Sequence, residues 1–291
     1  MTHASPLGRG IIGAMLLALA LVGCSAIKLG YSNLGELSYW WLDGYFDFDD
    51  DQARHVRQEL ARLHRWHRQD ELPHLVRTLA RMEQMAAGDV TAEQVCGVFD
   101  ELRQRLRGLR EQAEPALVAT ARRLTPANLA QLASKHERNN REWRRKWLRL
   151  PPHELTQQRA KQFQEHAERL YGSLEPVQRQ VLHEHKARSV FDPARALAER
   201  QRRQADLRLT LEQLQAPELD AGQARALLAG LLDRAERSPD AVWERHQEQL
   251  VREHCAVSAR IHNVASPAQR DAAISRLRSW QRDLIELAGR T

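Results

Sequence analysis

Apolar side chains recur along most of the chain at intervals of three and four residues, the spacing that places them on one face of an α-helix. The first such face runs over residues 53–67 and resumes over 72–82, and Pro73 predicts a break or kink between the two stretches. Gly88 and Asp89 predict the end of this first long helix. Two late faces have the same spacing, and they consist of Val242, Leu250, Val257 and Ile261, and of Ile274, Leu277, Leu284 and Leu287.

Helix starts are marked by capping residues. Thr91 and Gln94 predict a capping box for a helix that reaches about Leu124. Several later starts combine a capping residue with a proline at the first helical position, where its missing N–H costs no hydrogen bond. These pairs are Thr125-Pro126, Asp192-Pro193, Ser238-Pro239 and Ser266-Pro267, with Glu175-Pro176 as a weaker variant. The pattern predicts an all-α, bundle-like body of eight to ten helices, and the absence of a fixed repeat length argues against a solenoid.

Composition and charge agree with solvated helices. Gly and Pro are sparse, aromatic residues make up 5% of the chain, and no run after the N-terminal segment reaches the roughly 20 apolar residues of a spanning helix. The 44 Lys and Arg exceed the 38 Asp and Glu by only six, and the two signs alternate. We therefore expect no nucleic-acid partner, although a basic face could meet anionic lipid, polysaccharide or an acidic protein.

The N-terminal 23 residues have the features of an export signal. Arg9 is the only Lys or Arg before an apolar stretch from Ile11 to Val22, which is too short to span a bilayer. Leu21, Val22, Gly23 and Cys24 together resemble the lipobox of bacterial lipoproteins. That resemblance implies cleavage after Gly23, a diacylglycerol on the Cys24 thiol and an acyl group such as palmitate on the new amino terminus. The alternative is a buried cysteine in an N-terminal helix.

Ser25 follows the cysteine where an aspartate would suggest retention in the inner membrane. The resemblance therefore implies the periplasmic face of the outer membrane as the location of the protein. We divide the chain into a signal peptide at 1–23, a lipid-attachment and aromatic-rich segment at 24–49, and a helical periplasmic domain at 50–291.

Aromatic residues are concentrated just after the anchor. Six of the sixteen in the chain lie within ten positions: Tyr39, Trp40, Trp41, Tyr45, Phe46 and Phe48. Asp49 to Asp51 could cap the helix that follows, because carboxylates stabilise its exposed amides and the positive end of its dipole. Two interpretations remain open: the rings fill the core of the helical body, or they form an exposed contact surface for a membrane or a partner.

A second aromatic group lies at residues 139–147, in the sequence NNREWRRKW. Trp143 and Trp147 are one helical turn apart, and Arg144 and Arg145 lie between them. The tryptophans could pack in the core with the arginines around them. Alternatively, they could form a patch that binds a client chain, a glycan or a phosphate headgroup through stacking and cation–π contacts.

The cysteine and histidine residues give little indication of a metal or cofactor site. Apart from Cys24, the chain has Cys96 and Cys255, which in an oxidising compartment could form one disulfide or remain two buried thiols. Neither belongs to a CxxC or CxxCH motif. His64 and His67 share a helix face, but there is no HExxH motif and no carboxylate at a completing spacing. We expect no metal site and no cofactor.

Motifs for catalysis are missing as well. The sequence has no GxSxG, and it has no Glu-Ser pair of the kind that helical cell-wall lytic enzymes use. A non-catalytic protein is therefore the expectation, with an envelope protein or a glycan as its partner. A chaperone-like client binder and a peptidoglycan-active lytic enzyme remain the alternatives.

Two resemblances to known proteins support this expectation. The sequence YWWLDGYFDF followed by DDDQARHVRQELARLHRWHRQDELP, together with LTPANLAQL and NNREWRRKW, resembles an uncharacterised family of bacterial outer-membrane lipoproteins, a domain of unknown function. This resemblance covers nearly all of the mature chain and implies a helical fold with lipoprotein targeting, but no activity. The segments at 124–132, 173–182 and 266–274 also resemble the LTxxQ helix starts of periplasmic stress chaperones, although helix capping alone would explain them.

Overall fold

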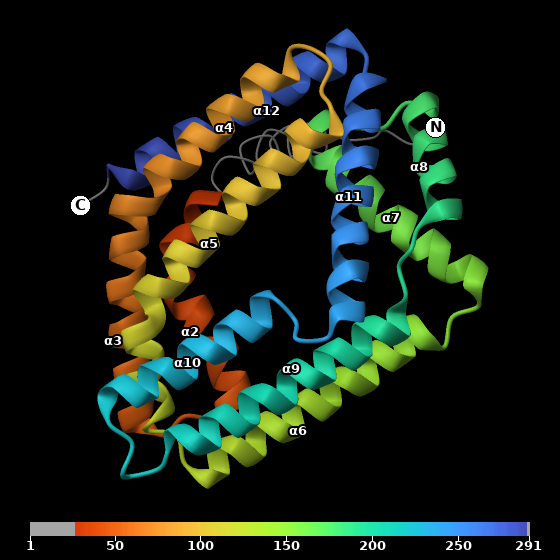
Figure 1. Ribbon diagram of the computed structural model, residues 1–291. Helices are drawn as coiled ribbons and strands as arrows, with labels where there is room; N and C mark the ends of the chain where they lie inside the picture. The colour runs from red at the N-terminus through yellow and green to blue at the C-terminus, as the bar shows by residue number, and fades with distance from the viewer. Residues whose placement is uncertain (1–26, 290–291) are drawn as a thin grey trace, which may run out of the picture.

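Helices are the only regular secondary structure in the part of the chain that the computed structural model describes, residues 27–289 (Figure 1). The predicted signal peptide and Cys24 lie outside these residues. The helices are α2 (Leu34–Phe46), α3 (Asp50–Trp66), α4 (Leu72–Ala86), α5 (Ala92–Ala121), α6 (Pro126–Trp143), α7 (Pro152–Tyr171), α8 (Pro176–Arg188), α9 (Pro193–Leu214), α10 (Ala221–Glu236), α11 (Ala241–Asn263) and α12 (Pro267–Ala288), with the π-helical turns η1 (His67–Glu71) and η2 (Arg144–Leu148). The predicted all-α class is confirmed.

The π-helical turns join neighbouring helices into longer rods. η1 connects α3 to α4 without a break, and Pro73, which has no N–H to donate, follows directly after this π-helical turn. The predicted kink near Pro73 thus lies at this π-helical turn, where α3 and α4 meet at an angle (Figure 1). Because η2 likewise extends α6, the described residues form ten long rods, within the predicted range.

Long helix pairs form two opposite sides of a roughly four-sided body (Figure 1). α4 and α12 lie side by side along one edge, and α6 and α9 lie along another. α11 runs between these edges and packs on α5, the longest helix. A disulfide joins Cys96 of α5 to Cys255 of α11, with 5.4 Å between the Cα atoms, and links two helices separated by 159 residues in sequence.

The predicted helix starts are present at four of the five cap–proline pairs. Pro126, Pro176, Pro193 and Pro267 are each the first residue of their helix. The start predicted at Ser238-Pro239 is wrong, since α11 begins at Ala241 and is capped by Asp240. The Ser238 hydroxyl instead donates to the carboxylate of Glu199 on α9, at 3.0 Å.

The most unusual feature of the fold is the pairing of capping residues from different helices. Gln52 in α3 and Asn128 in α6 each accept the N–H of their own cap residue through the side-chain oxygen. The Gln52 amide nitrogen also donates to the Asn128 oxygen at 2.9 Å. Asn128 in turn donates to the main-chain carbonyls of Phe46 and Asp47, where α2 ends in a left-handed turn.

The same arrangement recurs at the other end of the chain. Gln178 in α8 and Gln269 in α12 accept from their cap residues, and the Gln269 amide nitrogen donates to the Gln178 oxygen at 2.9 Å. Gln178 then donates to the carbonyl of Ile261 in α11. The side chains of both pairs are buried, so every polar atom in them requires a partner. The segments that resemble LTxxQ helix starts therefore serve as buried joints between helices.

We predict that Asn128→Ala lowers the free energy of unfolding by about 2–3 kcal/mol, because it removes one hydrogen-bond partner of the buried Gln52 amide and the donor to the Phe46 and Asp47 carbonyls. Gln223→Ala is the matched control, since Gln223 forms an equivalent capping box at α10 but is exposed, and its loss should cost less than about 1 kcal/mol. Urea unfolding of both variants measures the difference. Equal losses would show that the pairing of the caps adds no stability.

Candidate functional site

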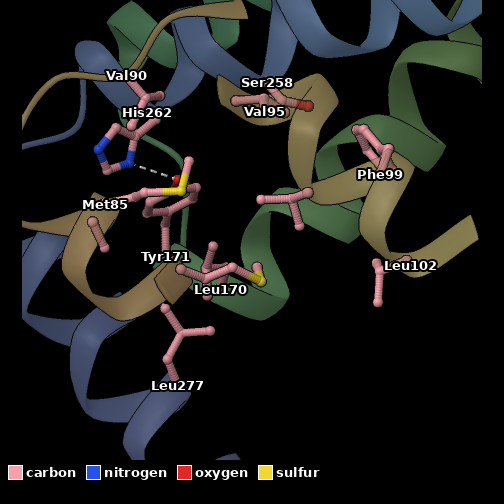
Figure 2. A pocket seen from close by; sticks show the side chains of 13 residues that line it. Met85, Val90, Val95, Phe99, Leu102, Leu170, Tyr171, Ser258, His262 and Leu277 are labelled. Carbon is pink, nitrogen blue, oxygen red and sulfur yellow. Dashed lines mark hydrogen bonds between the residues drawn. The ribbon is translucent and has the colours of Figure 1, made fainter. Parts of the chain in front are cut away.

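An apolar pocket of about 240 Å³ with a polar edge lies between α4, α5, α7, α11 and α12 (Figure 2). Met85 of α4 lies on one side of it, and Phe99 and Leu102 of α5 lie on another. Met82 of α4 also lines it. The remaining lining residues are Ala86, Val90, Val95, Val98, Leu170, Tyr171, Ser258, His262 and Leu277. Because apolar pockets of this kind usually hold an apolar group, the pocket suits an acyl chain or the side chains of a client protein.

The polar edge of the pocket is a short hydrogen-bonded chain. The Tyr171 hydroxyl lies 2.9 Å from Nδ1 of His262 (Figure 2), and Nε2 of His262 lies 2.7 Å from the carbonyl oxygen of Gly88. A carbonyl can only accept, so Nε2 carries the hydrogen and Nδ1 accepts from the tyrosine. Burial raises the pKa of Tyr171 to about 12 and lowers the pKa of His262, so both groups are neutral near pH 7.

One feature of the sequence, a pair of methionines, points to this pocket although it belongs to no known motif. Met82 and Met85 are the only methionines after the predicted signal peptide, they are three residues apart on one helix, and both line the pocket. Methionine side chains adapt to irregular apolar surfaces and are common where partners vary. Apart from α5, which follows α4 in the chain, the other helical walls come from residues 85 to 195 positions further along, so no local pattern could reveal them.

The aromatic segment after the predicted anchor is divided between the two interpretations. Tyr39 is buried against α3, and Phe46 stacks on Phe48 at 5.5 Å between ring centroids in the core. Trp40 and Trp41, in contrast, are 72% and 63% exposed. α2 therefore places part of its aromatic side chains in the core and the others on the surface.

Tyr45 lies between these groups. Its ring is 4.7 Å from that of Trp41, and its hydroxyl accepts from the Asn139 side chain of α6 at 2.9 Å. Tyr45 therefore joins the exposed edge of α2 to the body.

The group at residues 139–147 packs mainly as core. Trp147 is buried against Phe191, and the Trp143 indole donates to the carbonyl of Pro193 at 3.2 Å. Arg144 pairs with Glu137, while Arg145 is exposed. The arrangement is that of tryptophans packed on α9 with basic side chains around them, and the rings offer little surface to a ligand.

Several histidines make contacts that hold elements of the fold together. Tyr31, just before α2, donates to or accepts from Nδ1 of His67 at 2.9 Å and packs against the ring of His64. His185 lies 3.2 Å from the carboxylate of Glu253. Across residues 27–289, no group of three or more His, Cys, Asp or Glu side chains is arranged to hold a metal ion. No helix in the same range is long and apolar enough to cross a bilayer.

Comparison with known protein families places the chain in one of them. Residues 44–245 match the family of unknown function DUF6279, from the second half of α2 to the first turn of α11. The chain belongs to this family. No curated protein and no solved structure matches it. The DUF6279 region contains both residues of the Gln52–Asn128 pair but only Gln178 of the second pair. It also contains both methionines of the pocket.

We predict that the protein loses stability as the pH falls below 6.5, the ordinary pKa of histidine, because burial lowers the pKa of His262 in the folded state. A group with a lowered folded pKa stabilises the fold above its unfolded pKa, and this contribution is lost as the pH falls through the folded pKa. The pKa of seven other histidines is lowered for the same reason: His55, His64, His67, His136, His185, His246 and His254.

Urea unfolding between pH 7.5 and 5 tests this. His262→Gln should make the pH dependence shallower by up to about 1.4 kcal/mol per pH unit, the value for one proton. His153→Gln is the control, since His153 is exposed. Identical pH dependence in the wild type and His262→Gln would contradict the proposed neutral state of His262.

Proposed function

We propose that this protein is a lipid-anchored, non-catalytic interaction module on the periplasmic face of the bacterial outer membrane. The observation that carries the proposal is the apolar stretch from Ile11 to Val22, which ends in a lipobox-like sequence at Cys24. Diacylglycerol together with a further acyl chain would make attachment stable, since one chain alone binds only marginally. Pull-down from envelope extracts would identify the partner, an envelope protein or a glycan.

The start of the helical body supports a close attachment. Lys28 forms ion pairs with Asp283 and Glu286 of α12, and Asp283 is buried. Only residues 25–27 separate Cys24 from this fixed point. An acylated Cys24 would therefore hold the body directly against the membrane, without a long linker.

We predict that Cys24→Ala abolishes lipid attachment and leaves residues 1–23 uncut, because the thiol is the proposed acceptor of the lipid. Intact-mass measurement and membrane fractionation after expression in a Gram-negative host measure both effects. The double variant Cys96→Ser/Cys255→Ser is the control, since it removes the other two cysteines and should be lipidated normally. An unmodified, uncut wild-type chain, or a wild-type chain in the cytosol, would refute the anchor.

A chaperone-like client binder is the second candidate, and the apolar pocket favours it. Two methionines and the 40% exposed Phe99 offer an adaptable apolar surface of the kind that accepts varied partners. The enzymatic alternative, a peptidoglycan-active lytic enzyme, has no comparable observation in its favour. Release of muropeptides from purified sacculi would nevertheless overturn the non-catalytic proposal.

We predict that a chaperone of this design suppresses light scattering by an aggregating client at near-stoichiometric ratios, and that Phe99→Ser weakens this effect severalfold because it removes an apolar contact at the pocket. Leu106→Ser is the matched control, since Leu106 lies on the same helix, is 63% exposed and does not line the pocket. Equal suppression by both variants would exclude the pocket as the client site.

A further inference from the structure

α2 has an apolar face that no other part of the described chain covers. Leu34, Leu37, Trp40 and Trp41 are 40%, 58%, 72% and 63% exposed. At about 100° per residue, their spacing places all four within about 120° of the helix circumference. Within residues 27–289, these are the only two tryptophans that are exposed.

The other sides of α2 have their partners within the protein. Tyr39, Leu42 and Phe46 pack into the core with α3 and the body. Glu36 lies on a third side, where its carboxylate is 3.4 Å from Nε of Arg57, and the Arg57 guanidinium stacks on the Tyr39 ring at 3.6 Å. The exposed face of α2 is therefore separate from the side that packs in the core, and loose packing of the core does not explain it.

Charge is nearly absent along this part of the chain. Between Lys28 and Asp43, Glu36 is the only ionisable acid or base other than tyrosine, and it is paired with Arg57. An exposed apolar surface without charge suits the boundary of a bilayer, where tryptophan is favoured because it has a large apolar ring and one polar N–H. It gives no charge pattern that would select a particular protein partner.

The short length of chain between Cys24 and α2 favours the bilayer as the surface that covers this face. If Cys24 is lipidated, as proposed above, its sulfur lies at the membrane surface. The three-residue step from Cys24 to Ile27 spans at most about 10 Å, and a helix from Ile27 to Trp41 would extend about 21 Å further. The ion pairs of Lys28 and the contact of Tyr31 with His67 fix the start of this stretch to the body. The exposed face therefore begins within reach of the lipid surface and cannot be carried far from it by a flexible linker.

We propose that the exposed face of α2 lies in the interfacial layer of the membrane, with Trp40 and Trp41 at the depth of the lipid headgroups. The inference rests on the proposed lipid anchor and deepens it. The anchor attaches the chain at a single point, and α2 adds a second contact, which sets the orientation of the helical body on the membrane.

Tryptophan fluorescence of the full, lipidated chain tests the proposal. The protein is reconstituted into vesicles of phosphatidylethanolamine and phosphatidylglycerol that contain brominated acyl chains, which quench only tryptophans near the bilayer. We expect quenching in the wild type, and a loss of about half of it or more in Leu37→Glu, because a charge on the face opposes burial in lipid. Leu209→Glu is the matched control, since Leu209 is 51% exposed on α9.

Two further variants assign the signal. Trp40→Phe/Trp41→Phe should remove most of the quenched emission, whereas Trp143→Phe/Trp243→Phe should leave it unchanged. Circular dichroism and melting temperature of Leu37→Glu should match the wild type, because Leu37 is largely exposed.

The outcomes separate this inference from the proposed anchor. An intact mass without lipid refutes the anchor, and quenching of the same sample still reports whether α2 meets the bilayer. A lipidated chain whose tryptophans are not quenched, or whose quenching is the same in Leu37→Glu, refutes the contact of α2 with the bilayer alone. A dimer in detergent that Leu37→Glu dissociates would also overturn it, because the face would then be covered by a second copy of the chain.

Discussion

The fold depends on buried amide side chains that cap one helix while they bind another. Gln52 with Asn128 and Gln178 with Gln269 each connect two helix starts that lie 76 and 91 residues apart. Helix ends leave main-chain N–H and C=O groups without partners, and burying them is costly unless each is satisfied. These four side chains meet that requirement and at the same time fix the geometry between helices, so they specify the fold more narrowly than apolar packing alone.

The disulfide and the pocket depend on this framework. Cys96 and Cys255 hold α5 against α11, and the second amide pair holds α8 and α12 near the same end of α11. The apolar pocket lies where α4, α5, α7, α11 and α12 come together. Its polar edge, Tyr171 and His262, is satisfied within the protein, so a ligand would have to supply only apolar surface. That chemistry suits an acyl chain or a client side chain.

The N-terminal segment connects the body to the proposed anchor. Asn128 binds the carbonyls that end α2, so the first amide pair also fixes the helix that carries Trp40 and Trp41. An exposed apolar face is tolerated on a soluble surface only at some risk of aggregation. The proposed contact with a bilayer would remove that risk. The same residues that stabilise the fold thus position the surface through which we propose the protein meets the membrane.

Local patterns were sufficient to predict the helices, because helical spacing and caps such as Thr125 and Asp192 act within four residues. The same patterns wrongly predicted a helix start at Ser238, whose hydroxyl donates to Glu199 on another helix. The pattern also could not tell which aromatic side chains of the N-terminal segment are buried, or which amides pair. The sequence by itself determined the helical class and the proposed anchor. Only the tertiary structure decided the amide pairs, the pocket and the exposed face of α2, because each depends on groups far apart in the chain.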